Sequence, residues 1–204
     1  MRKVELYIFR HGETDWNREG RFQGRTDVPL NATGLQQAEN LRALLEFYKP
    51  EAMISSSLSR AAKTAEVVNR DMALAVVLMD ALRECNLGDA EGLLRTEMPL
   101  KFGEDCWGRW ISDKPEDRDY RFPNGESRDE HRTRLRDGIL GYCQSHPELK
   151  RLAVSIHGGC VRSLLSICEE APDPDGLRIG NCALLRLDLE LPTNRWRFLG
   201  KIEP

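Results

Sequence analysis

The fold is decided by the stretch VELYIFRHGET, residues 4–14. Its apolar run changes abruptly into arginine, histidine, glycine and an acid. This pattern is typical of a buried strand that delivers charged side chains to the edge of a sheet. Ligands of open α/β sheets bind just beyond the carboxyl ends of the strands. An arginine and a histidine at that place, followed by a glycine that lets backbone approach, favour an anionic ligand over a metal ion or a dinucleotide.

Segments typical of strands and of helices alternate along the rest of the chain. Short apolar runs that predict strands occur at residues 52–55, 74–79, 152–156, 182–189 and 195–202, the last two as a hairpin or as adjacent strands. Helical periodicity predicts helices at residues 33–49, from about residue 60, at 126–145 and after residue 159. This alternation predicts an α/β fold, a three-layer α/β/α sandwich with a mainly parallel sheet.

Some boundaries can be predicted more closely. The sequence Thr33-Gly34-Leu35-Gln36 resembles a capping box that opens the first long helix. Residues 14–32 lack periodicity and are predicted to form a loop. Residues 93–125 are the least regular part and are interpreted as a lid-like insertion. The chain contains no internal repeat or linker, so we predict a single domain over residues 1–204.

The composition of the 204 residues is that of an ordinary globular protein, with 40% hydrophobic and 31% charged residues. A net charge of −3 argues against a protein dedicated to nucleic acid or to anionic membranes. The six cysteines lack CxxC or Cys/His ligand spacing and are interpreted as reduced thiols. No signal peptide precedes the first strand, and no apolar run approaches the length of a membrane span. We therefore expect a cytoplasmic protein without nucleic-acid or membrane partners.

Two histidines follow predicted strands in similar settings: His11 comes after the first strand and His157 after residues 152–156. Since parallel strands end at the same edge of a sheet, the two imidazoles can share one pocket. Arg60, at the start of the second helix, also follows a strand end, and Arg162 is a weaker candidate. Such a group of arginines, histidines and helix amino ends binds phosphoryl groups through charge-assisted hydrogen bonds.

The usual sequence signatures of phosphate chemistry through a metal ion or a P-loop are missing. Walker A, GxGxxG, HExxH and EF-hand patterns do not occur. We therefore expect no metal ion and no cofactor, and imidazole itself becomes the candidate nucleophile. Phosphoryl transfer needs in-line attack and charge stabilisation, which one positioned histidine and nearby arginines can supply.

A series of short motifs shows which family the chain resembles. In order they are RHGET (10–14) with WN (16–17), GRFQG (20–24), DVPL (27–30), GLQQA (34–38), SSSLSRA (55–61) with TA (64–65), LRE (82–84), EG (91–92), PNGES (123–127) and SIHGG (155–159). An RHG triplet alone would be a weak signal, but the full series is specific. Over roughly residues 4–165 the chain resembles the histidine phosphatase superfamily, the phosphoglycerate-mutase-like proteins.

The resemblance implies a role for each matching residue. His11 would be the nucleophile that becomes a phosphohistidine, with its other ring nitrogen donating to a backbone carbonyl. Arg10, Arg60 and His157 would hold the phosphoryl oxygens. Glu84 would protonate the leaving alkoxide and then take a proton from the attacking water. The implied substrate-binding residues are Asn17, Gln23, Gly24 and Gly158.

The acid is the assignment with the most competitors. Glu13, Asp89 and Glu91 lie in similar loops, and of these Glu91 is interpreted as structural. The position within the family motif favours Glu84.

Other residues have plainer interpretations. His131 and His146 are predicted to be solvated surface residues. The run from Arg128 to Arg136 alternates arginines with acids and is interpreted as a solvated helix face. Trp107 and Trp110 either cover the pocket or fill a small core within the insertion, and the sequence leaves both alternatives open.

The superfamily contains phosphatases and mutases, and three details favour hydrolysis. Gln23-Gly24-Arg25 stands where mutases usually carry Thr or Ser followed by Gly and Trp. Residues 93–125 are short for the mutase insertion, and residues 107–125 look more like the small phosphatases, including those that act on α-ribazole phosphate. The expected partner is a small phosphate ester, with a homodimer also considered. A phosphoglycerate mutase is the alternative, and a non-catalytic phospho-ligand-binding module ranks last.

Overall fold

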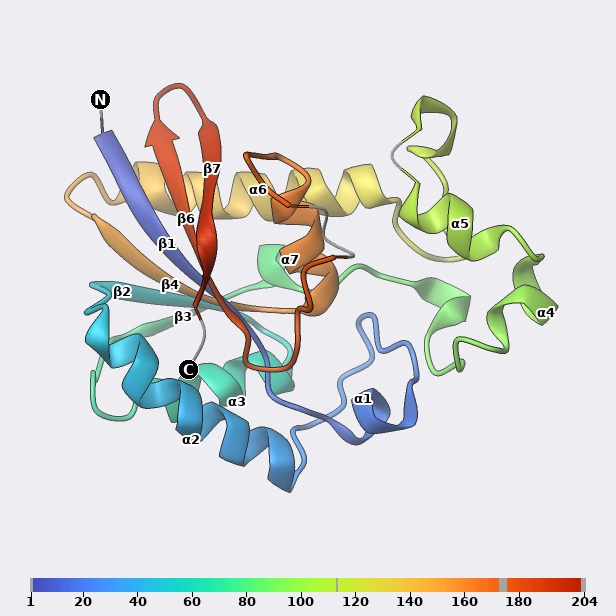
Figure 1. The fold of residues 1–204 in the computed structure, drawn as a ribbon, viewed down its shortest axis with the longest axis horizontal. Helices are drawn as coiled ribbons and strands as arrows, with labels where there is room; N and C mark the ends of the chain where they lie inside the picture. Colours follow the sequence, from blue (N-terminus) through green and yellow to red (C-terminus); the bar gives the residue numbers. More distant parts are fainter. Residues whose placement is uncertain (1, 113, 173–175, 203–204) are drawn as a thin grey trace.

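The sheet is built around its first strand. The computed structural model describes residues 2–112, 114–172 and 176–202. These contain a seven-stranded sheet in the order β3-β2-β4-β1-β6-β7-β5 (Figure 1). The strands are β1 (Arg2–Arg10), β2 (Ala52–Ser56), β3 (Val76–Met79), β4 (Arg151–Ile156), β5 (Cys168–Glu169), β6 (Leu184–Leu191) and β7 (Arg195–Ile202). β1 therefore lies in the middle, between β4 and β6.

The register between β1 and β4 decides what lies at the edge of the sheet. β3, β2, β4 and β1 are joined by parallel pairing, in which Arg10 is the partner of Ile156. The next residues along the two strands are His11 and His157, so both histidines leave the sheet side by side. Beyond β1, the strands β6 and β7 pair in antiparallel fashion. The predicted mainly parallel sheet and the late hairpin are confirmed.

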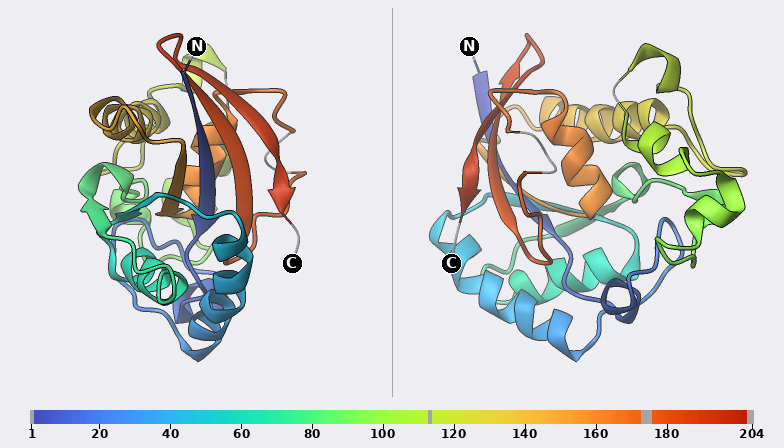
Figure 2. Two further views of the ribbon diagram at one scale, coloured as in Figure 1. Left: turned by 90° about the vertical axis from the view of Figure 1, so that its left-hand side faces the viewer. Right: turned by 45° about the vertical axis from the view of Figure 1, so that its right-hand side comes forward.

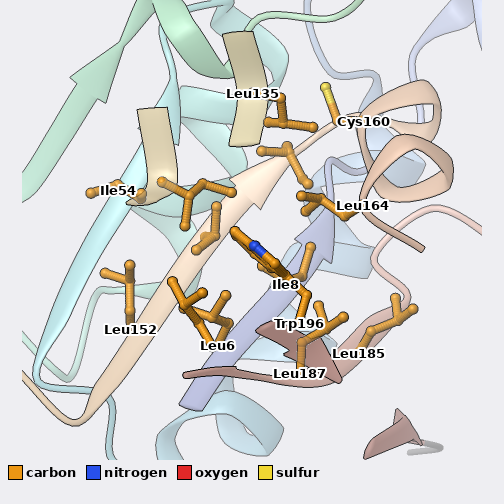
Figure 3. Packing of buried hydrophobic residues seen from close by; sticks show 14 of the residues in the cluster. Leu6, Ile8, Ile54, Leu135, Leu152, Cys160, Leu164, Leu185, Leu187 and Trp196 are labelled. Atoms are coloured by element: carbon orange, nitrogen blue, oxygen red, sulfur yellow. The ribbon is translucent and has the colours of Figure 1, made fainter. Parts of the chain in front are cut away.

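Helices cover both faces of the sheet because the side chains of β1 alternate. Val4, Leu6 and Ile8 lie in the larger core cluster, together with residues of α6 and α7 (Figure 3). Tyr7 and Phe9 lie in a second cluster with residues of α2 and α3. The covering helices are α6 (Arg128–Ser145) and α7 (Gly158–Leu165) on one face, and α2 (Ala32–Phe47) and α3 (Ser59–Val68) on the other (Figure 2). This is the predicted three-layer sandwich. Among the described residues, no helix has both the length and the hydropathy that a bilayer-spanning helix requires.

The irregular segment 93–125 has a small core of its own. It contains α4 (Met98–Phe102), α5 (Cys106–Ile111) and a 3₁₀ turn (Pro115–Asp117), and α4 and α5 lie apart from the sheet in Figure 1. Its buried residues pack with side chains from the preceding loop; the cluster includes Cys85, Leu87, Ala90, Met98, Cys106 and Phe122. The segment is therefore held in place by apolar packing.

Two predicted boundaries are wrong because side-chain caps decide them. The predicted loop 14–32 contains a short helix, α1 (Asp15–Glu19), which is closed by a reciprocal capping box between Thr14 and Asn17. The cap of α2 is Asn31, whose side-chain oxygen accepts from the backbone N–H of Gly34, and not the predicted Thr33.

Two glycines allow the loop after β1 to touch the start of α2. A Cβ atom on Gly34 would lie 2.1 Å from the backbone oxygen of Glu13, and one on Gly12 would lie 2.3 Å from the oxygen of Gly34. These neighbours are backbone atoms, which cannot rotate away. The close approach therefore fixes the path of the chain just beyond His11.

We expect Gly34→Ala to destabilise the protein, although alanine is normally the better helix former. The clash with Glu13 should cost about 1–3 kcal/mol of unfolding free energy. Gly141→Ala, inside α6 with nothing within 4 Å of the added Cβ atom, is the matched control and should stabilise by about 0.5–1 kcal/mol. Urea unfolding measures both, and equal stabilities of the two variants would contradict the packing described here.

Candidate active site

Two buried imidazoles lie against each other at the carboxyl edge of the sheet. His11 follows β1, and His157 lies between β4 and α7. Their ring centroids are 5.2 Å apart at an interplanar angle of 60°. His11 is 3% exposed and His157 is fully buried. The structure thus places the two histidines side by side, as the sequence predicted, but only His11 lines the cavity, with His157 packed behind it.

The hydrogen bonding of His11 leaves one ring nitrogen free to react. Its Nδ1 lies 2.6 Å from the carbonyl oxygen of Gly12. A carbonyl only accepts hydrogen bonds, so Nδ1 carries the proton and Nε2 keeps its lone pair. Burial and the nearby guanidinium groups of Arg10 and Arg60 hold the pKa of His11 well below its usual value. The imidazole is therefore neutral at physiological pH.

His157 is oriented by a serine. Its Nε2 lies 2.8 Å from the Ser56 hydroxyl, which accepts a hydrogen bond from the backbone N–H of Leu58. We assign the hydroxyl proton to the hydrogen bond with Nε2, which places the ring proton on Nδ1. Nδ1 is buried and has no hydrogen-bond partner in the described part of the chain. Burial, together with the positive charge of Arg60, also lowers the pKa of His157.

Two arginines add further buried donors. Arg10 donates from Nη1 to the carbonyl of Ile179. Arg60, in the first turn of α3 and only 1% exposed, donates to the carbonyls of Thr26 and Gly24. The Nε atoms of both arginines are buried without an acceptor in residues 2–112, 114–172 and 176–202. Leaving such donors unsatisfied is costly, and an anion that accepts from them would remove the cost.

Glu84 faces the same cavity and is held by backbone. Its Oε2 accepts from the N–H of Gly159 at 2.8 Å and its Oε1 from the N–H of Cys85 at 2.9 Å. The competing acids Glu13, Asp89 and Glu91 do not line the cavity. Glu91 instead accepts hydrogen bonds from residues 25, 26 and 87, which agrees with the structural role predicted for it.

The predicted substrate-binding residues lie around these groups. Asn17 accepts from Thr14 and Asn181 through its Oδ1, so its amide nitrogen is the end that can donate to a ligand. Gln23, Gly24 and Gly158 line the cavity with it. The structure therefore brings all nine predicted site residues together: eight line one cavity, and His157 packs behind it against His11.

The cavity is large and strongly cationic. Its volume is about 560 Å³, and Glu84 is the one carboxylate among its described lining residues. Six arginines line it: Arg10, Arg21, Arg60, Arg95, Arg128 and Arg162. Trp107 and Trp110 line it too, and both also pack in the small core of residues 93–125. The two alternatives left open for these tryptophans are therefore true together.

Two residues of α6 were missed by the sequence interpretation. His131, predicted to be solvated, is 2% exposed and lines the cavity, as does Arg128. His131 precedes Leu135, Ile139 and Cys143 at intervals of four residues, which places it on the buried face of the helix. The four-residue spacing could have identified His131 as buried, but the charged residues around it indicated a solvated helix face. His146, also predicted to be solvated, is half-buried just after the end of the helix, and its Nδ1 lies 2.8 Å from the carbonyl oxygen of Tyr142.

We expect the buried histidines to make the protein acid-sensitive. The folded state holds His11, His131 and His157 neutral, whereas the unfolded chain protonates them below the usual pKa of 6.5. The unfolded state then binds more protons, so stability falls as pH falls, by up to about 1.4 kcal/mol per pH unit for each histidine. His131, whose pKa burial lowers to about 3, can be tested alone. In His131→Gln the slope of unfolding free energy between about pH 5 and 6 should decrease by up to about 1.4 kcal/mol per unit. An unchanged slope would contradict this account.

Known proteins resemble this chain over nearly its whole length. The profile of the family described as the Histidine phosphatase superfamily (branch 1) matches residues 6–201. The chain is 33% identical over 191 residues to the uncharacterized phosphatase PhoE of Bacillus subtilis strain 168, covering 93% of this chain and 90% of that protein. It is also 33% identical over 189 residues to the probable phosphoglycerate mutase GpmB of Proteus mirabilis, covering 92% of this chain and 86% of that protein.

A solved structure matches over almost the same length. The mycobacterial glucosyl-3-phosphoglycerate phosphatase Rv2419c, in complex with VO3, superimposes with a TM-score of 0.82 at 29% identity, covering 96% of each chain. Since the profile spans nearly the whole sequence and the relatives share about a third of their residues with it, the chain belongs to the histidine phosphatase superfamily.

Proposed function

We propose that the protein hydrolyses a small phosphate monoester through a phosphohistidine on His11, without needing a metal ion. The observation that carries this proposal is a neutral imidazole with a free Nε2 beside three buried donors that have no acceptor in the described residues, on Arg10, Arg60 and His157. The donors can bind the phosphoryl oxygens, and the imidazole can attack phosphorus.

The reaction follows in two steps. His11 Nε2 forms a bond to phosphorus while the phosphorus–oxygen bond of the ester breaks, and Glu84 in its acid form gives its proton to the leaving alkoxide. The Glu84 carboxylate then takes a proton from a water molecule, whose oxygen attacks phosphorus. The phosphorus–nitrogen bond breaks, and inorganic phosphate leaves with His11 neutral again. Arg10, Arg60 and His157 hold the same oxygens in both steps.

The cavity also suggests the class of substrate. Among the described lining residues six arginines face a single carboxylate, which is more positive charge than one phosphoryl dianion balances. Arg95 belongs to the segment 93–125, and its Cζ lies 4.7 Å from the centroid of the Trp107 ring. Arg128 of α6 donates to the carbonyl of Ser112 in the same segment. We propose that these two arginines meet a second anionic group of the substrate, such as a carboxylate. Two of the relatives have names that refer to phosphoglycerate, which carries one.

The alternatives to this function are a mutase, a phosphatase for a different ester, and a module that binds phosphate esters without reacting. A mutase would return the phosphoryl group from His11 to the substrate instead of passing it to water. α-Ribazole phosphate has no second anionic group and should therefore be a poorer substrate than a phosphoglycerate-type ester. A module that only binds phosphate esters would show affinity without turnover.

We expect Glu84→Gln to separate the two chemical steps. Loss of the general acid should reduce kcat for an alkyl phosphate by about 10²–10⁴-fold. With p-nitrophenyl phosphate the leaving group needs no proton, so His11 is phosphorylated quickly and the phosphoenzyme accumulates. Radiolabelled substrate and peptide mapping, with a chelator present, should place the label on His11. Glu13→Gln, an acid outside the cavity, is the control and should behave like the wild type. A label on another residue would sink the proposal.

We expect the protein to prefer 3-phosphoglycerate over glycerol 3-phosphate, which lacks the carboxylate. A preference of about tenfold in kcat/KM corresponds to about 1.4 kcal/mol of binding to the second anion. Arg95→Gln and Arg128→Gln should each reduce it, whereas Arg121→Gln, which pairs with Glu130 outside the cavity, should not. Equal rates for the two esters would contradict the substrate class. Formation of 2-phosphoglycerate in place of free phosphate would identify a mutase.

A further inference from the structure

One wall of the cavity holds two side chains that the proposed reaction does not use. His131 of α6 and Cys160 of α7 lie next to Glu84. The Nε2 of His131 is 3.3 Å from the Sγ of Cys160 and 3.8 Å from the Oε1 of Glu84, and that Oε1 is 3.7 Å from the Sγ. An imidazole, a thiol and a carboxylate thus converge on one point, although they are far apart in the sequence.

The three distances match the edges of a tetrahedral metal site. Zinc binds sulfur at about 2.3 Å and nitrogen or oxygen at about 2.0–2.2 Å, so neighbouring ligand atoms of a tetrahedron lie about 3.4–3.6 Å apart. The observed separations of 3.3, 3.7 and 3.8 Å are within a few tenths of an ångström of that geometry. Only small side-chain movements would be needed to hold an ion.

The protonation states suit a metal ion as well. The Nδ1 of His131 lies 3.2 Å from the hydroxyl of Ser163, a partner that can accept its proton and so leave the Nε2 lone pair facing the thiol. Burial lowers the pKa of His131 to about 3, so the ring is neutral, as a ligand must be. Burial raises the pKa of the Cys160 thiol, so the ion has to displace that proton. The resulting thiolate and the Glu84 carboxylate together balance the two positive charges of the ion.

The cluster is reached from the substrate cavity. Glu84 and His131 line the cavity, while Cys160 is fully buried behind them. An ion would therefore enter from the side on which the substrate binds and leave its fourth position on that side. In the absence of an ion, the thiol lies within reach of the carbonyls of Leu82 and Arg83, which satisfy it.

We propose that Glu84, His131 and Cys160 form a binding site for a soft divalent cation such as Zn²⁺, and that the bound ion inhibits the phosphatase. In the binding step the sulfur–hydrogen bond of Cys160 breaks, the proton passes to solvent and a sulfur–metal bond forms. A Glu84 carboxylate that ligates the ion can neither carry a proton to the leaving alkoxide nor take one from the water that attacks the phosphohistidine, so the second step also slows for p-nitrophenyl phosphate. The inhibitory part rests on the proposed function, whereas the metal site itself does not.

Cobalt tests the site without any assay of activity. Co²⁺ added to the chelator-treated, reduced protein should give one equivalent of a sulfur-to-metal charge-transfer band, which Zn²⁺ should abolish by competition. The band should be lost in Cys160→Ala and weakened in His131→Ala. It should persist in Cys143→Ala, a buried thiol on α6 outside the cluster, and in the inactive variant His11→Ala. The absence of a band, or a band that remains in Cys160→Ala, overturns the site.

Zinc tests the inhibitory role. Zn²⁺ should slow the hydrolysis of p-nitrophenyl phosphate, and a chelator should restore it. Measured against each variant's own metal-free rate, half-inhibition of Cys160→Ala should need at least about tenfold more Zn²⁺, whereas Cys143→Ala should match the wild type. A cobalt band that depends on Cys160 without zinc inhibition would overturn the inhibitory role alone. A protein that binds cobalt in this way but hydrolyses no ester would overturn the proposed function and leave the site standing.

Discussion

The parallel register between β1 and β4 is the constraint on which the site depends. It places His11 and His157 side by side at the edge of a sheet, and helices pack on both faces of that sheet. A buried strand pair cannot slip by one residue without turning its apolar side chains the wrong way. The distance between the two imidazoles is thus set by the packing of Leu6, Ile8 and Phe9, which take no part in the chemistry.

The same cationic groups serve binding and reactivity. Arg10, half-buried, and Arg60, buried, lie beside His11, and their charge opposes protonation of the imidazole. The candidate nucleophile is therefore neutral at the place where the field for an anion is strongest. The folded protein keeps buried N–H groups without acceptors in its described part, a cost that a phosphoryl group would remove on binding. Donors that are already in place need not reorganise during the reaction, which is the basis of electrostatic catalysis.

Glu84 belongs both to the proposed acid–base chemistry and to the proposed metal site. Two backbone N–H groups fix its carboxylate at the cavity wall, and a Cβ atom on Gly159 would lie 2.4 Å from its Oε1, so that residue has to be glycine for the acid to lie there. On its other side lie an imidazole and a thiol. The position from which the carboxylate would reach a leaving group in the proposed reaction also makes it one of three candidate metal ligands. Phosphatase activity and sensitivity to zinc would then depend on the same side chain.

The sequence by itself determined the elements that have strong local causes. Short apolar runs predicted the strands, helical periodicity predicted the long helices, and the motifs around His11, Arg60, Glu84 and His157 predicted residues that the structure brings together. Local caps such as Thr14 with Asn17, and Asn31, were harder to recognise, because a capping box can be read at several neighbouring positions.

Only the tertiary structure decided which distant residues meet. His131 and Cys160 are 29 positions apart, and no spacing rule relates them. They come together because α6 and α7 pack against the same face of the sheet, beside the loop that carries Glu84. Likewise, the cavity receives Arg95 because apolar packing holds the segment 93–125 in place over it, and Arg128 because α6 begins beside that segment, where this arginine donates to the carbonyl of Ser112. Such contacts depend on the burial of whole faces, a property of the folded chain that no local pattern of residues contains.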